Sequence, residues 1–95
     1  MIEITGRLLA VCQRAVRERD DMKQLLQTTG ECGELIAAIA DYERGRVPRS
    51  KVTKEVADVL VLLVQYSLRE GLATMCSALD LSLDRLEEVL RGERG

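Results

Sequence analysis

The chain has 95 residues, a formal net charge of −2 and no His. Its length allows one small domain, and its acidic balance argues against a module for nucleic-acid polymers, which would present a strongly basic face. The three Cys residues are widely spaced without a C-x-x-C pair, so neither a zinc site nor a disulfide framework is expected.

The first predicted element is a helix over residues 2–19, because Ile4, Leu8 and Cys12 recur every four residues. Asp20 and Asp21 then offer N-cap chemistry for a second helix over residues 22–44. Residues 45–50 contain the only Pro and are predicted to form a loop.

A third helix is predicted over residues 50–69, and Gly71 marks its end. A fourth helix follows over residues 73–91, and residues 92–95 are expected to fray. Apolar residues alternate along the fourth helix in steps of four and three, as in a packed helix–helix seam: Leu72, Cys76, Leu79, Leu83, Leu86 and Leu90.

The sequence therefore predicts a single all-α domain over residues 1–95, with a four-helix bundle-like subunit. Phe and Trp are absent, so the core must be aliphatic. The apolar third and fourth helices exceed what one small chain can bury, and we expect a homodimer or homotetramer with an active site near the subunit interface. Free thiols, no signal-peptide layout and no apolar run of about 20 residues predict a cytoplasmic protein without membrane contact.

Four pairs of carboxylates are spaced three residues apart. Glu18 with Asp21 and Asp84 with Glu87 look like solvated faces, whereas Glu31 with Glu34 and Glu55 with Asp58 lie in small or apolar surroundings. Residues at this spacing project from one face of a helix. Asp58 lies in an apolar segment, residues 56–64, which we expect to be buried. Two interpretations are open for Asp58: an ion pair with Lys54 at the edge of the core, or a cation shared with the other three carboxylates.

If the second and third helices are antiparallel, the two acidic pairs can face each other. Four converging carboxylates would raise one another's pKa values unless a cation is present. Oxygen ligands without His or Cys favour Mg²⁺, with Mn²⁺ as a substitute, and Mg²⁺ commonly shares its coordination with substrate phosphates. Gly30 and Gly33 lower the helix propensity here, which indicates either close approach of a helix or ligand, or ordinary tolerance.

Residues 31–39 read ECGELIAAI, and residues 55–60 read EVADVL. Twenty residues, 35–54, separate Glu34 of the first motif from Glu55 of the second. This E-x-x-E, gap, E-x-x-D order resembles the signature of the MazG-like nucleotide pyrophosphohydrolases, over roughly residues 25–90. The resemblance implies an all-α fold, a dimer or a dimer of dimers, and hydrolysis of a nucleoside or deoxynucleoside triphosphate to the monophosphate and pyrophosphate. It puts Glu31, Glu34, Glu55 and Asp58 in the metal-ligand places, with Glu34 as the residue that takes a proton from water.

The chain also departs from the MazG-like pattern. Gly30 stands where many relatives are acidic, Gln27 or Thr28 stands near a frequent Lys, and Ser82 replaces a Lys of the last helix, whereas Arg85 is kept. Substrate contacts are accordingly predicted at Arg85, at Lys54 and at Arg49 in the basic cluster of residues 44–54. Such a basic run is more often a solvated loop than a phosphate-binding site.

Two other functions are consistent with the sequence. Phosphoribosyl-ATP pyrophosphatases resemble this fold and also use acidic helices, and the substrate that turns over separates the two enzymes. A non-enzymatic helical dimerisation or adaptor module, with purely structural acidic pairs, would bind no Mg²⁺.

Overall fold

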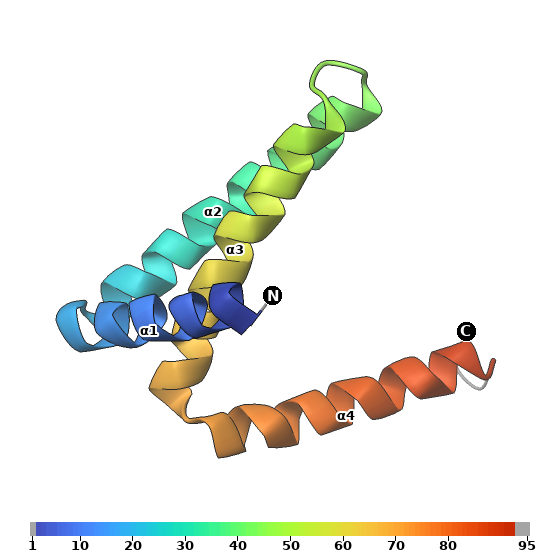
Figure 1. Ribbon diagram of the computed structural model, residues 1–95. Coiled ribbons are helices and arrows are strands. Elements are labelled where there is room, and N and C mark those ends of the chain that lie inside the picture. Colours follow the sequence, from blue (N-terminus) through green and yellow to red (C-terminus); the bar gives the residue numbers. More distant parts are fainter. Residues whose placement is uncertain (1, 93–95) are drawn as a thin grey trace.

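The computed structural model describes residues 2–92, and all of the regular structure in that range is α-helical (Figure 1). The four helices are α1 (Ile2–Glu18), α2 (Asp21–Glu43), α3 (Arg49–Glu70) and α4 (Leu72–Leu90). Every bound lies within one residue of its prediction, and the all-α class is confirmed. Of the tail expected to fray, residues 93–95 lie outside the described range.

Local sequence explains where the helices begin and end. The Asp20 carboxylate caps α2 as predicted, because its Oδ1 accepts a hydrogen bond from the Met22 N–H at 3.2 Å. Pro48 precedes the first turn of α3, where its fixed φ of −75° suits the start of a helix. Gly71 has a φ of +104°, which glycine adopts readily, and α3 and α4 meet there at a bend of 120°.

α2 and α3 form an antiparallel hairpin, and α1 crosses α3 on another side (Figure 1). The α1–α3 contact and the α2–α3 contact each include a side-chain hydrogen bond to a carbonyl of α3, and the two carbonyls belong to neighbouring residues. The Cys12 thiol of α1 faces the Val61 carbonyl at 3.6 Å, and Gln24 Nε2 of α2 donates to the Leu62 carbonyl at 3.4 Å. Cys12, Gln24 and Leu62 are all buried, so the small core lies where the three helices meet.

Arg69 ties the turn between α1 and α2 to the end of α3. Its Nε donates to Gln24 Oε1 at 2.9 Å, and its Nη2 donates to the carbonyls of Arg19 at 3.1 Å and Val16 at 3.4 Å. The Asp21 carboxylate lies 3.4 Å from the same guanidinium. Three helix ends are therefore held by one side chain that is only 22% exposed.

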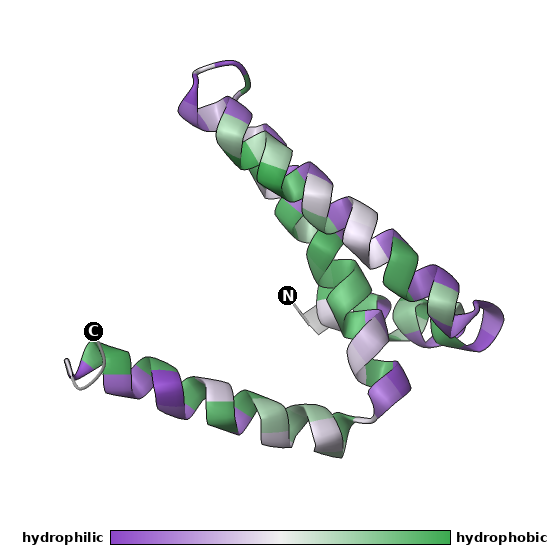
Figure 2. Cartoon of the chain, turned by 180° about the vertical axis from the view of Figure 1, so that it is seen from behind, coloured by the Kyte–Doolittle hydropathy of each residue, from purple (hydrophilic) through white to green (hydrophobic). Residues whose placement is uncertain are grey.

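α4 extends away from the other three helices and packs chiefly against the neighbouring end of α3 (Figure 1). It has no buried residue, and hydrophobic colour follows one edge of it (Figure 2). The predicted fourth helix is thus present, but it does not complete a bundle within one chain. The accessible surface is 7380 Å², against roughly 5,500 Å² for a compact protein of this mass. The radius of gyration is 15.9 Å, against about 12 Å for a compact domain of this length.

The expected burial of residues 56–64 is wrong for the single chain. Only Leu62 of that segment is fully buried, whereas Val56, Leu60 and Leu63 are each close to half exposed. α1 and α2 cover part of the circumference of α3, and the remainder faces outward. Among residues 2–92 no single helix is long and apolar enough to cross a membrane; α3 and α4 meet the length and composition criteria only as a bent pair.

Candidate metal centre

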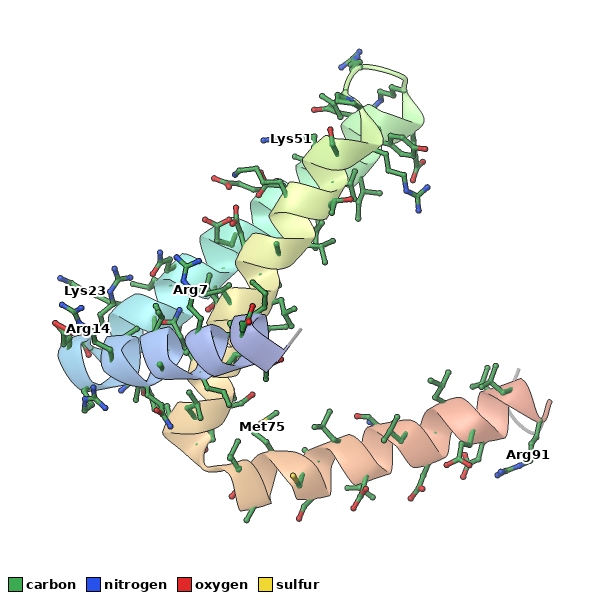
Figure 3. The ribbon with its side chains drawn as sticks, viewed as in Figure 1. Arg7, Arg14, Lys23, Lys51, Met75 and Arg91 are labelled. Atoms are coloured by element: carbon green, nitrogen blue, oxygen red, sulfur yellow. The ribbon has the colours of Figure 1, made fainter. Side chains whose placement is uncertain are left out.

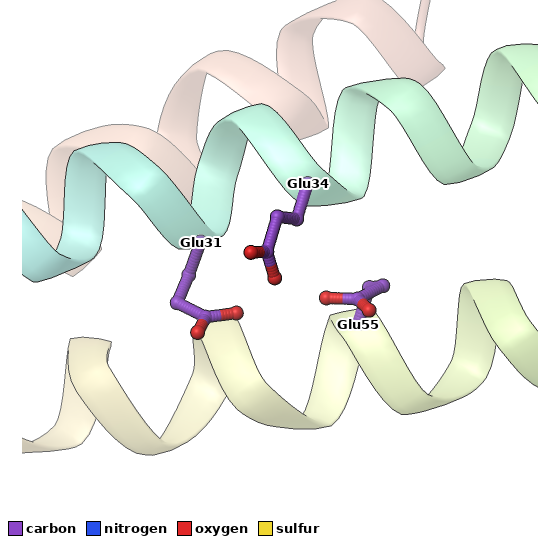
Figure 4. Close-up of side chains that lie close together, drawn as sticks. All are labelled: Glu31, Glu34 and Glu55. Atoms are coloured by element: carbon purple, nitrogen blue, oxygen red, sulfur yellow. The ribbon is translucent and has the colours of Figure 1, made fainter.

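Three carboxylates from two helices converge between α2 and α3. Glu31 and Glu34 of α2 and Glu55 of α3 each place one oxygen within 4.8 Å of the others, and the side chains point toward one another (Figure 4). Glu55 is 1% exposed, Glu31 is half-buried and Glu34 is exposed. The sequence prediction that the two acidic pairs face each other is therefore met by three of its four residues.

Glu55 is charged and partly neutralised by lysines of its own helix. Its Oε1 accepts a hydrogen bond from Lys51 Nζ at 2.9 Å, and Lys54 Nζ lies at 3.5 Å. The Lys51 hydrogen bond and charge hold the pKa of Glu55 below its ordinary value, against the opposing effect of burial. From sequence Lys51 was assigned only to the basic cluster of residues 44–54, although its i, i+4 spacing to Glu55 is the signal for such a pair.

Glu31 has the opposite perturbation. Burial raises the pKa of Glu31 above its ordinary value, and the negative charges of Glu34, Asp58 and Glu55 raise it further. One oxygen of Glu31 and one of Glu55, both Oε2, are buried without a hydrogen-bond partner in the described chain. Orphaned acceptors of this kind are rare in folded proteins, where a water, an ion or a ligand commonly satisfies them.

Asp58 lies beside the cluster rather than within it. Its Oδ2 accepts a hydrogen bond from Lys54 Nζ at 3.0 Å, which is the ion pair that the sequence offered as one of two interpretations. Its side chain is 40% exposed, not buried as expected, because this turn of α3 is left uncovered. Asp58 still acts on the centre, since its charge raises the pKa of Glu31 and both residues line the same hollow.

The charges of this region do not balance. Glu31, Glu34, Glu55 and Asp58 carry four potential negative charges, while Lys51 and Lys54 supply two positive ones. When all four carboxylates are ionised, the excess is therefore two negative charges, at a position where burial and repulsion both resist it. A divalent cation has the charge and the oxygen preference that this donor set requires.

One hollow adjoins the centre, and a second hollow lies next to the first. One of about 330 Å³ is lined by Glu31 and Asp58 together with Arg19, Gln27, Val61, Leu62 and Gln65. The other, of about 570 Å³, is lined by Glu18, Arg19, Asp20, Lys23 and Gln27 at the corner between α1 and α2. Arg19 and Gln27 line both hollows, so the two hollows are neighbours, and we call them together the trough. Sequence reasoning did not identify either residue as functional, because eight positions separate them and only the fold brings them together.

The predicted substrate-binding residues occupy different places. Lys54 is at the centre, paired with Asp58 and Glu55. Arg49 lies at the start of α3 with its guanidinium over the Tyr42 ring, 5.8 Å from the centroid. Arg85 is on α4, which extends away from α2, and its guanidinium donates to Ser82 at 3.3 Å (Figure 1). One chain therefore does not bring Arg85 to the carboxylates.

Gly30 and Gly33 are not places of close helix approach within the chain. A Cβ at either position would meet no atom of another described segment within 4 Å. No protein-family model, curated protein or solved structure matches this chain. The case for a function consequently rests on the residues and geometry of the centre.

Proposed function

We propose that the chain is a Mg²⁺-dependent nucleoside triphosphate pyrophosphohydrolase of the MazG-like kind, which converts a nucleoside or deoxynucleoside triphosphate to the monophosphate and pyrophosphate. The observation that carries the proposal is the meeting of Glu31, Glu34 and Glu55 between α2 and α3, with one buried, unpartnered oxygen on Glu31 and one on Glu55. The two acidic motifs stand in the order that this enzyme class uses.

The donor set fits Mg²⁺ or Mn²⁺. Glu31, Glu34 and Glu55 would hold the cation, with Asp58 as the fourth carboxylate once Lys54 releases it. When bound, the cation supplies positive charge to the phosphate oxygens of the substrate. Zinc is a poorer fit, because its protein sites favour His and Cys, and Cys32 is the one Cys within the acidic motifs.

The chain's own residues supply proton transfer and orientation. Hydrolysis forms a bond from water oxygen to the α phosphorus and breaks the bond from that phosphorus to the bridging oxygen, which leaves with pyrophosphate. Glu34 is the exposed member of the cluster and is placed to take the proton of the attacking water and return it to solvent. Glu55, held by Lys51, stays ionised and keeps the α3 side of the centre in position.

The test is product analysis over a panel of nucleoside and deoxynucleoside triphosphates, with phosphoribosyl-ATP included for the alternative enzyme. With Mg²⁺ we expect monophosphate and pyrophosphate in equal amounts and no orthophosphate. Glu34→Gln should remove nearly all activity, while Glu43→Gln, on the same helix, exposed and outside the cluster, should leave it unchanged. Orthophosphate as the product would assign the cleavage to a different bond.

A helical dimerisation or adaptor module is the second candidate, and the uncovered α4 favours it. In that case the lysine pairs of Glu55 and Asp58 are purely structural. Mg²⁺ binding separates the two candidates: an adaptor should show no Mg²⁺-dependent change in melting temperature, and no turnover of any triphosphate or of phosphoribosyl-ATP.

We also infer that a second copy of the chain covers the apolar edge of α4. The surface excess over a compact protein of this mass is roughly 1,900 Å², more than the roughly 800 Å² that each partner buries in a standard interface. Five leucines of the predicted seam share one side of α4, and each is at least half exposed: Leu72, Leu79, Leu83, Leu86 and Leu90. A homodimer or homotetramer built on this seam would bury them, whereas Arg85 lies on roughly the opposite side of α4.

A further inference from the structure

The trough beside the carboxylates contains cations without acidic partners. Arg19 and Lys23 line the hollow at the corner between α1 and α2, where Figure 3 labels Lys23. Neither side chain forms an ion pair with a carboxylate of residues 2–92. Two carboxylates line the same hollow: Glu18 is paired with Arg14, whereas Asp20 caps the Met22 N–H and keeps its negative charge. Arg19 and Lys23 therefore outnumber the one remaining carboxylate, Asp20, and the lining carries an excess of positive charge.

Arg19 is also held in place. Its Nη1 donates to Gln27 Oε1 at 3.2 Å, which directs the guanidinium along α2 toward the turn that carries Glu31. Its backbone is fixed at both ends, because its N–H donates to the Ala15 carbonyl at 2.9 Å and its carbonyl accepts from Arg69 at 3.1 Å. Four of the five guanidinium N–H donors remain for a ligand.

The ligand that fits this trough is an extended anion. At one end Glu31 and Asp58 require a cation between them and any phosphate, and at the other Arg19 offers a planar donor group suited to two phosphate oxygens. The two adjoining hollows, of about 330 and 570 Å³, lie in the size range of ligand sites. An anion bound only at the carboxylates would leave Arg19 unused.

We propose that Arg19, positioned by Gln27 and Arg69, is a substrate-binding residue that holds the distal phosphates of the nucleotide and so retains the pyrophosphate product. This inference rests on the proposed function, because it assigns the direction in which the phosphate chain lies across the centre. Lys23 stands at the outer end of the same trough and adds long-range attraction.

The experiment measures binding of inorganic pyrophosphate to the full chain by calorimetry, with and without Mg²⁺. For the wild type we expect binding that requires Mg²⁺. Arg19→Ala should weaken it by about tenfold or more, as expected for loss of a charge-assisted phosphate contact. Arg17→Ala is the matched control, since Arg17 is exposed, lies two residues away and lines neither hollow, and it should change affinity less than twofold.

Two further variants guard against a trivial loss of structure. Arg19→Lys keeps the charge without the planar donor group and should recover part of the affinity. Gln27→Lys combined with Arg19→Ala places a cation in the same trough and should recover part as well. The Mg²⁺-dependent rise in melting temperature should persist in all of these variants, because the carboxylates are unchanged.

Equal affinities for Arg19→Ala and Arg17→Ala would overturn the assignment, and so would a wild type that binds no pyrophosphate in Mg²⁺. The proposed enzyme activity is refuted by a different result. A wild type that binds pyrophosphate through Arg19 but hydrolyses no triphosphate would refute the hydrolase and leave the phosphate site standing.

Discussion

Replacement of Leu83 by Glu tests the α4 seam directly. Leu83 is 53% exposed and shares one side of α4 with Leu79 and Leu86. Leu81 is 61% exposed but lies on roughly the opposite side, because two residues advance the helix by about 200°. Leu81→Glu is therefore a control with the same chemistry, on the same helix, with similar exposure.

The magnitude follows from the exposure. Full burial of a leucine stabilises by about 1.5–3 kcal/mol, so burying the exposed half of Leu83 contributes about 1 kcal/mol per copy. A two-fold dimer contains this contact twice, and a glutamate at the seam must also be desolvated at a cost of several kcal/mol per ion. We expect Leu83→Glu to weaken association by at least about 4 kcal/mol, which is roughly a thousandfold or more in Kd.

The assay is light scattering after size exclusion at micromolar concentration. The wild type and Leu81→Glu should have the mass of a dimer or tetramer, and Leu83→Glu should shift toward the 10.6 kDa monomer. A wild-type monomer at this concentration would refute self-association. Equal dissociation by both variants would refute the seam as the surface responsible.

Three other expectations concern the centre and the corner. Millimolar Mg²⁺ or Mn²⁺ should raise the melting temperature of the wild type, because binding to the folded state stabilises it by mass action. Glu55→Gln or Asp58→Asn should abolish that rise, while circular dichroism still shows a helical protein. A wild type whose melting temperature is unchanged by both ions would contradict the metal centre. Because the pKa of Glu31 is raised in the folded state, the metal-free protein should lose stability as pH rises from the ordinary glutamate pKa through the folded value. Glu31→Gln should lack this decline in thermal melts. The same dependence of melting temperature on pH in both proteins would count against the raised pKa. Arg69→Ala should lower the free energy of unfolding by about 1.5–3 kcal/mol in urea titrations, because it removes charge-assisted hydrogen bonds from three helix ends, and Arg69→Lys should recover little, since one ammonium cannot reach all of them.

The centre could be predicted from sequence in its α2 half and only partly in its α3 half. Glu31 and Glu34 share a face through helical spacing alone. On α3 the same spacing gave Glu55 and Asp58 equal weight, yet the structure buries Glu55 and leaves Asp58 at 40% exposure. The rotation of α3 about its own axis, relative to α2, decides which of these two residues faces Glu31 and Glu34. This rotation depends on which side of α3 packs against α1.

The sequence by itself determined the helices, because periodic apolar positions, the Asp20 cap, Pro48 and Gly71 act within a few residues of one another. It also determined that two acidic pairs at helical spacing lie in small or apolar surroundings and that oxygen donors dominate. Tertiary structure alone decided that Glu55 meets Glu31 and Glu34, that Arg69 fixes the corner, and that Arg19 reaches Gln27. It also decided that α4 lies uncovered, since the 120° bend at Gly71 separates the seam from the core. These outcomes depend on contacts between residues far apart in the chain, and local patterns carry no information about them.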